Sequence, residues 1–251
     1  MGTGNTATVL GRLVQRSGHT VSQVVGRTYA GMERLGNLLH APFTNDPKAI
    51  TTEGDLYILA VSDNAIGQVA SWLSVDKRLV VHTAGSVGSE ILSGCSTNYG
   101  VLYPLQSLRK EMEELPQIPF LVEGNTKDVG AVIYDFASTM SANVKFATAH
   151  ERLITHIAAI IVSNFTNHLY VVSEDFCNRE HIDFNLLQPL IRETVMRLEK
   201  FSPTQMQTGP ASRNDTETIT KHLRLLDRYP LQRSLYEFLT ESILNSANLR
   251  T

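Results

Sequence analysis

The chain has 251 residues, of which 42% are hydrophobic and 19% charged, and its formal net charge is −3. A chain of this length forms one large domain or two modest ones, each with a core of its own. The small negative charge gives no electrostatic basis for a nucleic-acid partner. Cys95 and Cys177 are far apart in the sequence, so neither a disulfide framework nor a zinc or other metal site is expected.

The longest apolar runs, such as IAAIIV, are far too short to span a bilayer. With no membrane partner indicated, we expect a cytoplasmic enzyme or binding protein.

The chain opens on GTGNTA, in which Gly2, Gly4 and Ala7 fit the G-x-G-x-x-G/A turn of dinucleotide-binding folds. Gly4 would let the backbone approach a pyrophosphate, and the amides of Asn5 and Thr6 would point at its phosphates from a helix N-terminus. In such folds a central buried strand precedes the glycines, and a sheet without it would expose two apolar edges. We therefore expect apolar residues upstream of Met1, so that the first strand of the sheet is truncated in this sequence.

Helices and strands alternate after the glycines. Apolar spacing predicts helices from residue 7 to 17, 30 to 39, 66 to 73 and 127 to 140. Apolar and β-branched runs predict strands within residues 19–28, 55–63, 78–85, 99–104, 118–124 and 143–148. This alternation predicts a doubly wound α/β Rossmann domain with a parallel sheet over residues 1–148.

The end of the second strand indicates which dinucleotide binds. NAD sites place a carboxylate there, whereas NADP sites often place an arginine for the 2′-phosphate. This chain has Arg27 and Thr28 and no carboxylate within reach, which predicts NADP, although Arg27 could also be an ordinary exposed loop residue.

Ligands of open α/β sheets bind at the carboxyl ends of the strands. Val61 and Ser62 follow one predicted strand, and His82 and Thr83 end the next, where the nicotinamide should lie. We expect all four near the cofactor. His82 could act as a proton donor or could bind the backbone.

From residue 149 to 251 the pattern is entirely helical, with four predicted helices and no linker before them. The first is apolar almost all round, which predicts a buried helix, yet it carries His156, Asn164 and Asn167. Such polar groups either cross-link helices or contact a ligand. Asn214 and Glu217 have the spacing of a capping box at the start of the third helix.

A Rossmann half followed by a helical half resembles the superfamily of 6-phosphogluconate dehydrogenase, pyrroline-5-carboxylate reductase and ketopantoate reductase. The motifs GTGNTA, HTAGS, YPLQS, HIAAIIVSNFTNHLY and QTGPASRND resemble more closely a bacterial family labelled Rossmann-like and NADP-dependent oxidoreductase-like, with a C-terminal domain of unknown function. The resemblance covers essentially the whole chain. It implies an NADP site, a substrate cleft between the domains and a homodimer built through the helical domain.

The chain departs from the hydroxy-acid dehydrogenases of that superfamily, which carry a lysine on the first long helix and an asparagine one turn later. His156 and Asn164 are the nearest equivalents, and a histidine can exchange a proton near neutral pH. Arg213, within QTGPASRND, is placed to hold a substrate carboxylate.

These observations predict an NADP-dependent oxidoreductase that transfers a hydride between nicotinamide and a small carboxylated substrate. His156 and Asn164 would serve the chemistry, and Asn167 and Arg213 would bind the substrate. The alternative is a non-catalytic NADP(H)-binding sensor or regulatory protein.

Overall fold

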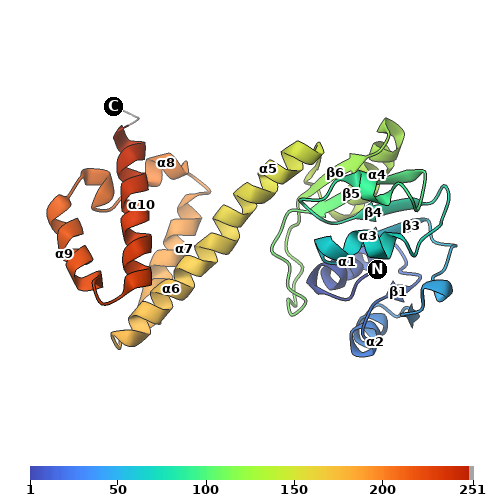
Figure 1. The fold of residues 1–251 in the computed structure, drawn as a ribbon, viewed down its shortest axis with the longest axis horizontal. Helices are drawn as coiled ribbons and strands as arrows, with labels where there is room; N and C mark the ends of the chain where they lie inside the picture. The colour runs from blue at the N-terminus through green and yellow to red at the C-terminus, as the bar shows by residue number, and fades with distance from the viewer. Residues whose placement is uncertain (249–251) are drawn as a thin grey trace. The chain divides into compact units, whose positions relative to one another are not determined.

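The computed structural model describes residues 1–248 and divides into two compact units, Met1–Ser163 and the helices from Asn164 onward. The first unit contains the sheet and the second is helical (Figure 1). The division falls inside a π-helical turn, η4 (Ile160–Phe165), whereas the sequence places the boundary at residue 149, where the long helical segment begins. The mixed α/β and all-α fold class is confirmed.

The main sheet has five strands in chain order: β3 (Leu56–Leu59), β4 (Leu79–His82), β5 (Asn98–Pro104), β6 (Phe120–Gly124) and β7 (Val144–Phe146). A separate pair joins β1 (Val24–Val25) to β2 (Phe43–Thr44). All pairings are parallel except that of β5 with β6, so the expectation of a wholly parallel sheet was wrong. The reason is local: residues 105–119 form no helix, and a parallel return needs a long crossover connection.

Helices cover both faces of the five-stranded sheet (Figure 1). On one face, α1 (Asn5–Arg16) and α4 (Lys127–Met140) pack on the sheet through a cluster that includes Leu10, Phe120 and Ile133. On the other face, α3 (Ile66–Ala70) and the short turn η3 (Ser89–Leu92) bury Leu59. The first unit is therefore doubly wound, as the alternating pattern predicts.

The helix α2 (Tyr29–Leu38) packs on the smaller strand pair rather than on the main sheet. Gly36 in α2 has no room for a side chain, because a Cβ there would lie 2.6 Å from the ring of Phe43 in β2. Close packing of this kind holds the β1–β2 pair and α2 together.

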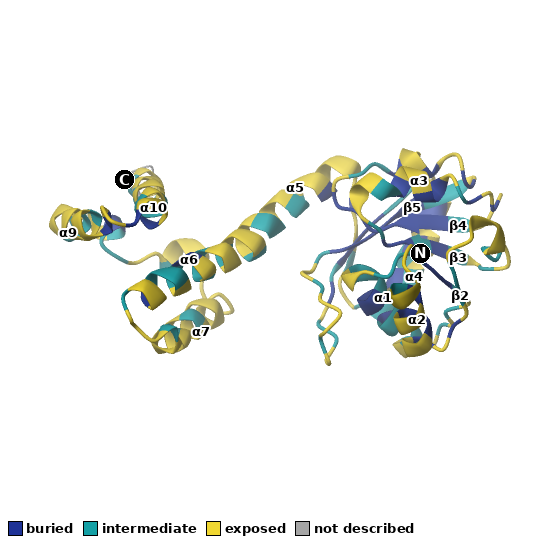
Figure 2. Ribbon diagram, turned by 60° about the horizontal axis from the view of Figure 1, so that its bottom comes forward, coloured by how far each residue is buried: buried dark blue, intermediate teal, exposed yellow. Residues whose placement is uncertain are grey.

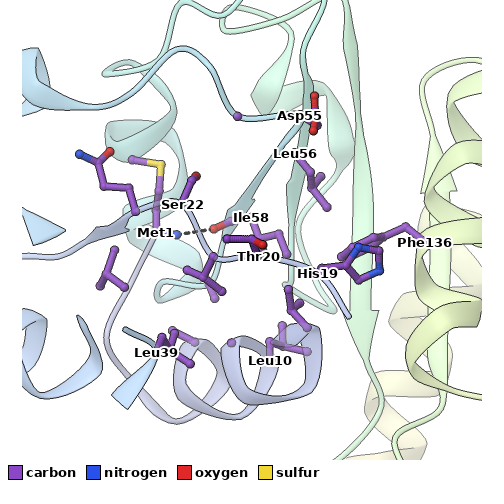
Figure 3. A pocket seen from close by; sticks show the side chains of 18 of the residues that line it. Met1, Leu10, His19, Thr20, Ser22, Leu39, Asp55, Leu56, Ile58 and Phe136 are labelled. Carbon is purple, nitrogen blue, oxygen red and sulfur yellow. Dashed lines mark hydrogen bonds between the residues drawn. The ribbon is translucent and has the colours of Figure 1, made fainter. Parts of the chain in front are cut away.

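A slot lies between β1 and β3, and Met1 lines one end of it (Figure 3). Gly2 lines the same end. The Met1 amino group donates to Ile58 O at 2.6 Å, and the Ala60 N–H donates to Met1 O at 2.8 Å. These are the two bonds that a parallel strand makes with its neighbour. On the other side, the Gly2 N–H donates to Val25 O at 2.7 Å. The first two residues thus have one strand on each side.

The slot itself is a cavity of about 710 Å³. Its lining is mixed. Apolar side chains such as Leu10, Leu56 and Ile58 face polar ones from the segments before β1 and β3, among them His19, Thr20, Ser22 and Asp55 (Figure 3). Burial lowers the pKa of the Met1 ammonium, which lies at one end of the cavity, to about 6.

The second unit is built from α6 (Thr166–Arg179), α7 (Gln188–Arg197), the short α8 (Pro203–Met206), α9 (Thr216–Leu226) and α10 (Pro230–Asn248). Phe176 of α6 meets Tyr229, just before α10, edge to face at 5.0 Å, and Gln232 donates to Asp175 at 3.1 Å. The predicted cap of α9 was wrong by one residue. Asp215, not Asn214, is the N-cap and accepts from the Thr218 N–H, because Asn214 adopts a left-handed conformation with φ 52°.

The long helical segment of α5 (Ala149–Ala159), η4 and α6 was expected to be buried, and in this chain it is not. Val162 is 73% exposed and Phe165 59%, and exposed residues predominate along the segment (Figure 2). The second unit also exposes many large apolar side chains, among them Leu186, Leu190, Met196 and Phe238. A helix that is apolar all round requires a covering surface, and the described residues of the chain do not supply it. No helix in the described part of the chain is long and apolar enough to cross a membrane.

Candidate functional site

The glycine turn joins Met1 to α1. Gly2 has φ +109°, and a Cβ there would lie 2.1 Å from Ala60 O, so only glycine fits. Gly4 is the N-cap of α1, and a Cβ built on it meets no heavy atom within 4 Å. Glycine at position 4 is therefore not required by packing within the chain, and the space above it is open to a ligand.

The N-terminus of α1 has the properties of a phosphate site. No side chain caps it, and its first turn contains no acidic residue. Asn5 and Thr6 form that first turn, so their amides are among the donors that an α-helix leaves without an internal partner. The turn and the uncapped helix together fit a pyrophosphate. Asn5 also accepts the Lys110 N–H at 3.3 Å, which brings the 105–119 loop to this end of α1.

Arg27 and Thr28 follow β1, and both side chains are exposed. Thr28 is the N-cap of α2 by backbone conformation, but its hydroxyl makes no capping bond. In the described residues Arg27 forms no ion pair, so its guanidinium is free to meet an anion. The structure thus places both predicted residues at the carboxyl end of β1.

His82 ends β4 and is fully buried, at 0% exposure. Its Nδ1 accepts the Ala84 N–H at 3.2 Å, and its Nε2 lies 3.2 Å from Gly88 O. A backbone donor on one nitrogen and a backbone acceptor on the other fix a neutral imidazole with the proton on Nε2. Burial, assisted by the charge of Arg152, lowers the pKa of His82 to about 4. Of the two roles considered from the sequence, the structure has the backbone-binding one, and the ring holds the loop of residues 83–88.

The other predicted residues at the strand ends lie on that edge of the sheet. Val61 and Ser62 follow β3, and Thr83 follows β4 with its N–H donating to Leu59 O at 3.3 Å. The loops after β3 and β4 are joined by Ser86, whose hydroxyl donates to Asp63 at 2.6 Å. The sequence analysis assigned no role to Asp63.

His156 of α5 meets Tyr103 at the carboxyl end of β5. The Tyr103 hydroxyl and His156 Nδ1 are hydrogen-bonded at 2.9 Å, with the rings edge to face. Gly85 lies against both rings: a Cβ there would be 2.9 Å from His156 Cγ and 3.1 Å from Tyr103. Tyr103 is buried and His156 half-buried. Burial, with the negative charge of Asp63, raises the pKa of Tyr103, so its hydroxyl keeps the proton at neutral pH.

An ion pair anchors α5 above this site. Arg152, 1% exposed, bonds the Glu123 carboxylate of β6 and donates to Val87 O at 2.7 Å. Arg152 precedes His156 by four residues, so both side chains lie on one face of α5. The pair therefore fixes the helix face that presents His156 to Tyr103. Arg152 Nε is the one buried polar side-chain atom without a partner in the described structure.

Three predicted site residues belong to the second unit. Asn164 and Asn167 lie in η4 and α6, and Arg213 lies in the short turn η6 (Ala211–Arg213). All three side chains are exposed. The roles assigned to them stay predictions. In the described part of the chain, no three His, Cys, Asp or Glu side chains gather as metal ligands would.

Sequence reasoning missed Tyr103, Arg152 and Glu123. Tyr103 carried a usable signal, because it stands at the end of a predicted strand, where Val61 and His82 were also sought. Arg152 precedes His156 by one helical turn, but nothing local to Glu123 indicates that the two side chains pair. That contact depends on how α5 lies across β6.

The fold and this site define a Rossmann-like protein with a C-terminal helical domain. A family model described as a Rossmann-like domain matches residues 1–106, and the model of a domain of unknown function, DUF2520, matches residues 118–243. The chain belongs to the DUF2520 family. This confirms the resemblance read from the motifs.

Solved structures agree with this assignment. A candidate NADP oxidoreductase from Bacteroides fragilis is 34% identical, with a TM-score of 0.89 over 97% of this chain and 96% of that one. A reductive aminase from Aspergillus terreus, in complex with NADPH and ethyl levulinate, is 14% identical, with a TM-score of 0.72 over 98% and 92%. An imine reductase from Myxococcus stipitatus, in complex with NADP+, is 13% identical, with a TM-score of 0.65 over 98% and 92%. At such low identity the last two show the fold alone. A comparison with curated proteins finds no match.

Proposed function

We propose that this protein is an NADP(H)-dependent oxidoreductase that acts on a C=O or C=N bond of a small carboxylated molecule. The observation that carries the proposal is the hydrogen-bonded Tyr103–His156 pair beside Gly85, on the same sheet edge as the glycine turn. A nucleotide site alone would also suit a sensor. A buried phenol with a half-exposed imidazole behind it is a means of moving a proton, which a sensor does not need.

The chain's own groups fit the cofactor. The open space over Gly4 and the uncapped first turn of α1 would take the pyrophosphate, and Arg27 with Thr28 would take the 2′-phosphate. When bound, NADPH supplies a hydride to the substrate carbon. His82 touches no ligand in this scheme and holds the 83–88 loop, which carries Gly85, in place.

The pair Tyr103–His156 would supply the proton. As the substrate carbon gains the hydride, the Tyr103 hydroxyl donates its proton to the substrate oxygen or nitrogen. His156 Nδ1 then returns a proton to the phenolate, and Nε2 takes one from solvent. In the oxidative direction each transfer runs backwards. Arg152 is a positioning residue, since it orients the helix that carries His156.

The test begins with thermal shifts in the presence of NADPH against a panel of keto acids, imines and hydroxy acids. With a substrate identified, Tyr103→Phe keeps the ring but removes the proton, so turnover should fall about 10²- to 10⁴-fold with NADPH affinity unchanged. His156→Gln should give a loss of the same order. Tyr99→Phe is the matched control, because Tyr99 lies at the opposite end of β5.

Two results would contradict the proposal. Full turnover in Tyr103→Phe would exclude the Tyr103 hydroxyl as the proton donor. NADPH binding without turnover on any member of the panel would favour the alternative, a sensor.

We also propose a homodimer formed through the helical unit. Its exposed apolar side chains, such as Leu186 at 71% and Phe238 at 69%, exceed what a monomer normally leaves in contact with water. A second copy of the same surface would cover them. Light scattering coupled to gel filtration should give twice the chain mass, and Phe238→Glu should shift the species toward the monomer. A monodisperse monomer at micromolar concentration would rule this out.

A further inference from the structure

A second arginine lies beside the glycine turn. Arg34 of α2 donates from Nη2 to Thr3 O at 3.0 Å, so its guanidinium is held at the turn. The side chain is exposed and, like Arg27, forms no ion pair with any described residue. A guanidinium has five N–H donors, and one bond to Thr3 leaves most of them for another partner.

Thr3 is the point at which three segments meet. A Cβ on Gly26, at the end of β1, would lie 2.6 Å from Thr3 Cγ2. A Cβ on Gly31, in the first turn of α2, would lie 2.8 Å from Thr3 Oγ1 and 2.9 Å from Thr28 Oγ1. Two hydroxyls therefore lie close to one point, next to the glycine turn.

Arg34 follows Gly31 by three residues, so it lies on the same face of α2. Two hydroxyls and a tethered guanidinium thus gather on one side of the helix start. The acidic neighbour Glu33 does not share that face, because consecutive helix residues point in different directions. The first turn of α2 contains no acidic residue. The local charge is positive.

We propose that Arg34 binds the 2′-phosphate of NADP(H) together with Arg27, and that Arg34 is the preorganised member of the two. This inference rests on the proposed function. A phosphate presents three terminal oxygens, and the planar guanidinium fork matches them with two parallel bonds. The bond to Thr3 O already restricts the Arg34 side chain. Arg27 forms no hydrogen bond or ion pair with any residue that the structure describes, so more conformational entropy is lost when it binds a ligand than when Arg34 does.

The experiment measures the Kd of NADPH and of NADH by calorimetry for the wild type and for Arg34→Gln. Loss of a hydrogen bond to a charged group corresponds to a rise of about 10- to 100-fold in the Kd of NADPH, with the Kd of NADH changing less than about threefold. Arg16→Gln is the matched control, since Arg16 is an exposed arginine at the opposite end of α1. Arg34→Lys keeps the charge without the fork and should lie between wild type and Arg34→Gln. It replaces Arg34→Gln if that variant does not fold.

A Kd of NADPH that does not change in Arg34→Gln would overturn the inference. Equal weakening of both cofactors would also overturn it, because Arg34 would then act on the glycine turn through Thr3. In either case the wild type still binds NADPH, so the proposed function stands. A wild-type protein that binds neither cofactor refutes the proposed function itself.

Discussion

The buried imidazole of His82 makes the stability of the first unit depend on pH. In the folded chain the pKa of His82 is about 4, whereas an exposed histidine has a value near 6.5. Between these values the unfolded chain binds a proton that the folded chain does not. Stability from this group is therefore complete above about pH 6.5 and is lost as the pH falls toward 4.

The size of the effect follows from the two pKa values. Each pKa unit corresponds to 1.36 kcal/mol, so the full loss is about 3 kcal/mol, and about 2 kcal/mol of it has occurred by pH 5. The single tryptophan, Trp72, packs against the core of the first unit and reports its unfolding in urea. His82→Gln cannot titrate, so the difference in free energy of unfolding between wild type and variant should shrink by about 3 kcal/mol from pH 7.5 to 4.

Comparison with the variant removes the contribution of the carboxylates, which titrate in both proteins. NMR resonances of the His82 ring give an independent reading, with a midpoint near pH 4 in the folded state. A constant difference between wild type and variant across this range, or a ring that titrates near 6.5, would refute the reasoning.

Three further predictions follow from the first unit. Arg27→Asp should weaken NADPH binding by about 1.5–3 kcal/mol and leave NADH binding unchanged or improved, and equal loss for both in calorimetry would make Arg27 structural. Glu123→Gln leaves Arg152 buried without its anion, so the free energy of unfolding in urea should fall by about 3 kcal/mol or more. An unchanged free energy of unfolding would mean that water reaches the guanidinium. An extended apolar segment of about four residues joined to Met1 should enter the slot and raise the melting temperature by several degrees, because each buried aliphatic side chain contributes about 1.5–3 kcal/mol. A polar segment of equal length is the control. Equal melting temperatures for the two segments would exclude insertion.

Local patterns predicted most of the first unit. The helix expected over residues 127 to 140 is α4, and in the structure the Thr126 side chain caps its first turn. The strand β1 was overextended: only Val24 and Val25 pair with β2. Strand propensity marks where a strand can form, but pairing depends on the neighbouring strands. Among the described residues, β1 pairs with β2 on one side and bonds only the Gly2 N–H on the other.

Site residues could be predicted only where the strand pattern fixes their place, as at the carboxyl ends of the strands. His156 was named from its place among isoleucines, yet its partner Tyr103 comes from another element and no periodicity links them. The apolar surface of the long helix was read correctly as apolar and wrongly as buried. The hydrophobic pattern of a helix predicts that a face is buried. It does not distinguish burial against the same chain from burial against another chain.

The contact of Gly85 with His156 links two positions that are distant in the sequence. A methyl group at position 85 would meet the imidazole at 2.9 Å, so the small residue and the histidine constrain each other. Substitution at one position alters which residues are tolerated at the other. In homologous sequences the two positions should vary together, with bulkier residues at 85 appearing where a smaller side chain has replaced the imidazole at 156. A variant that enlarges the residue at position 85 would therefore need a smaller side chain at position 156 as well.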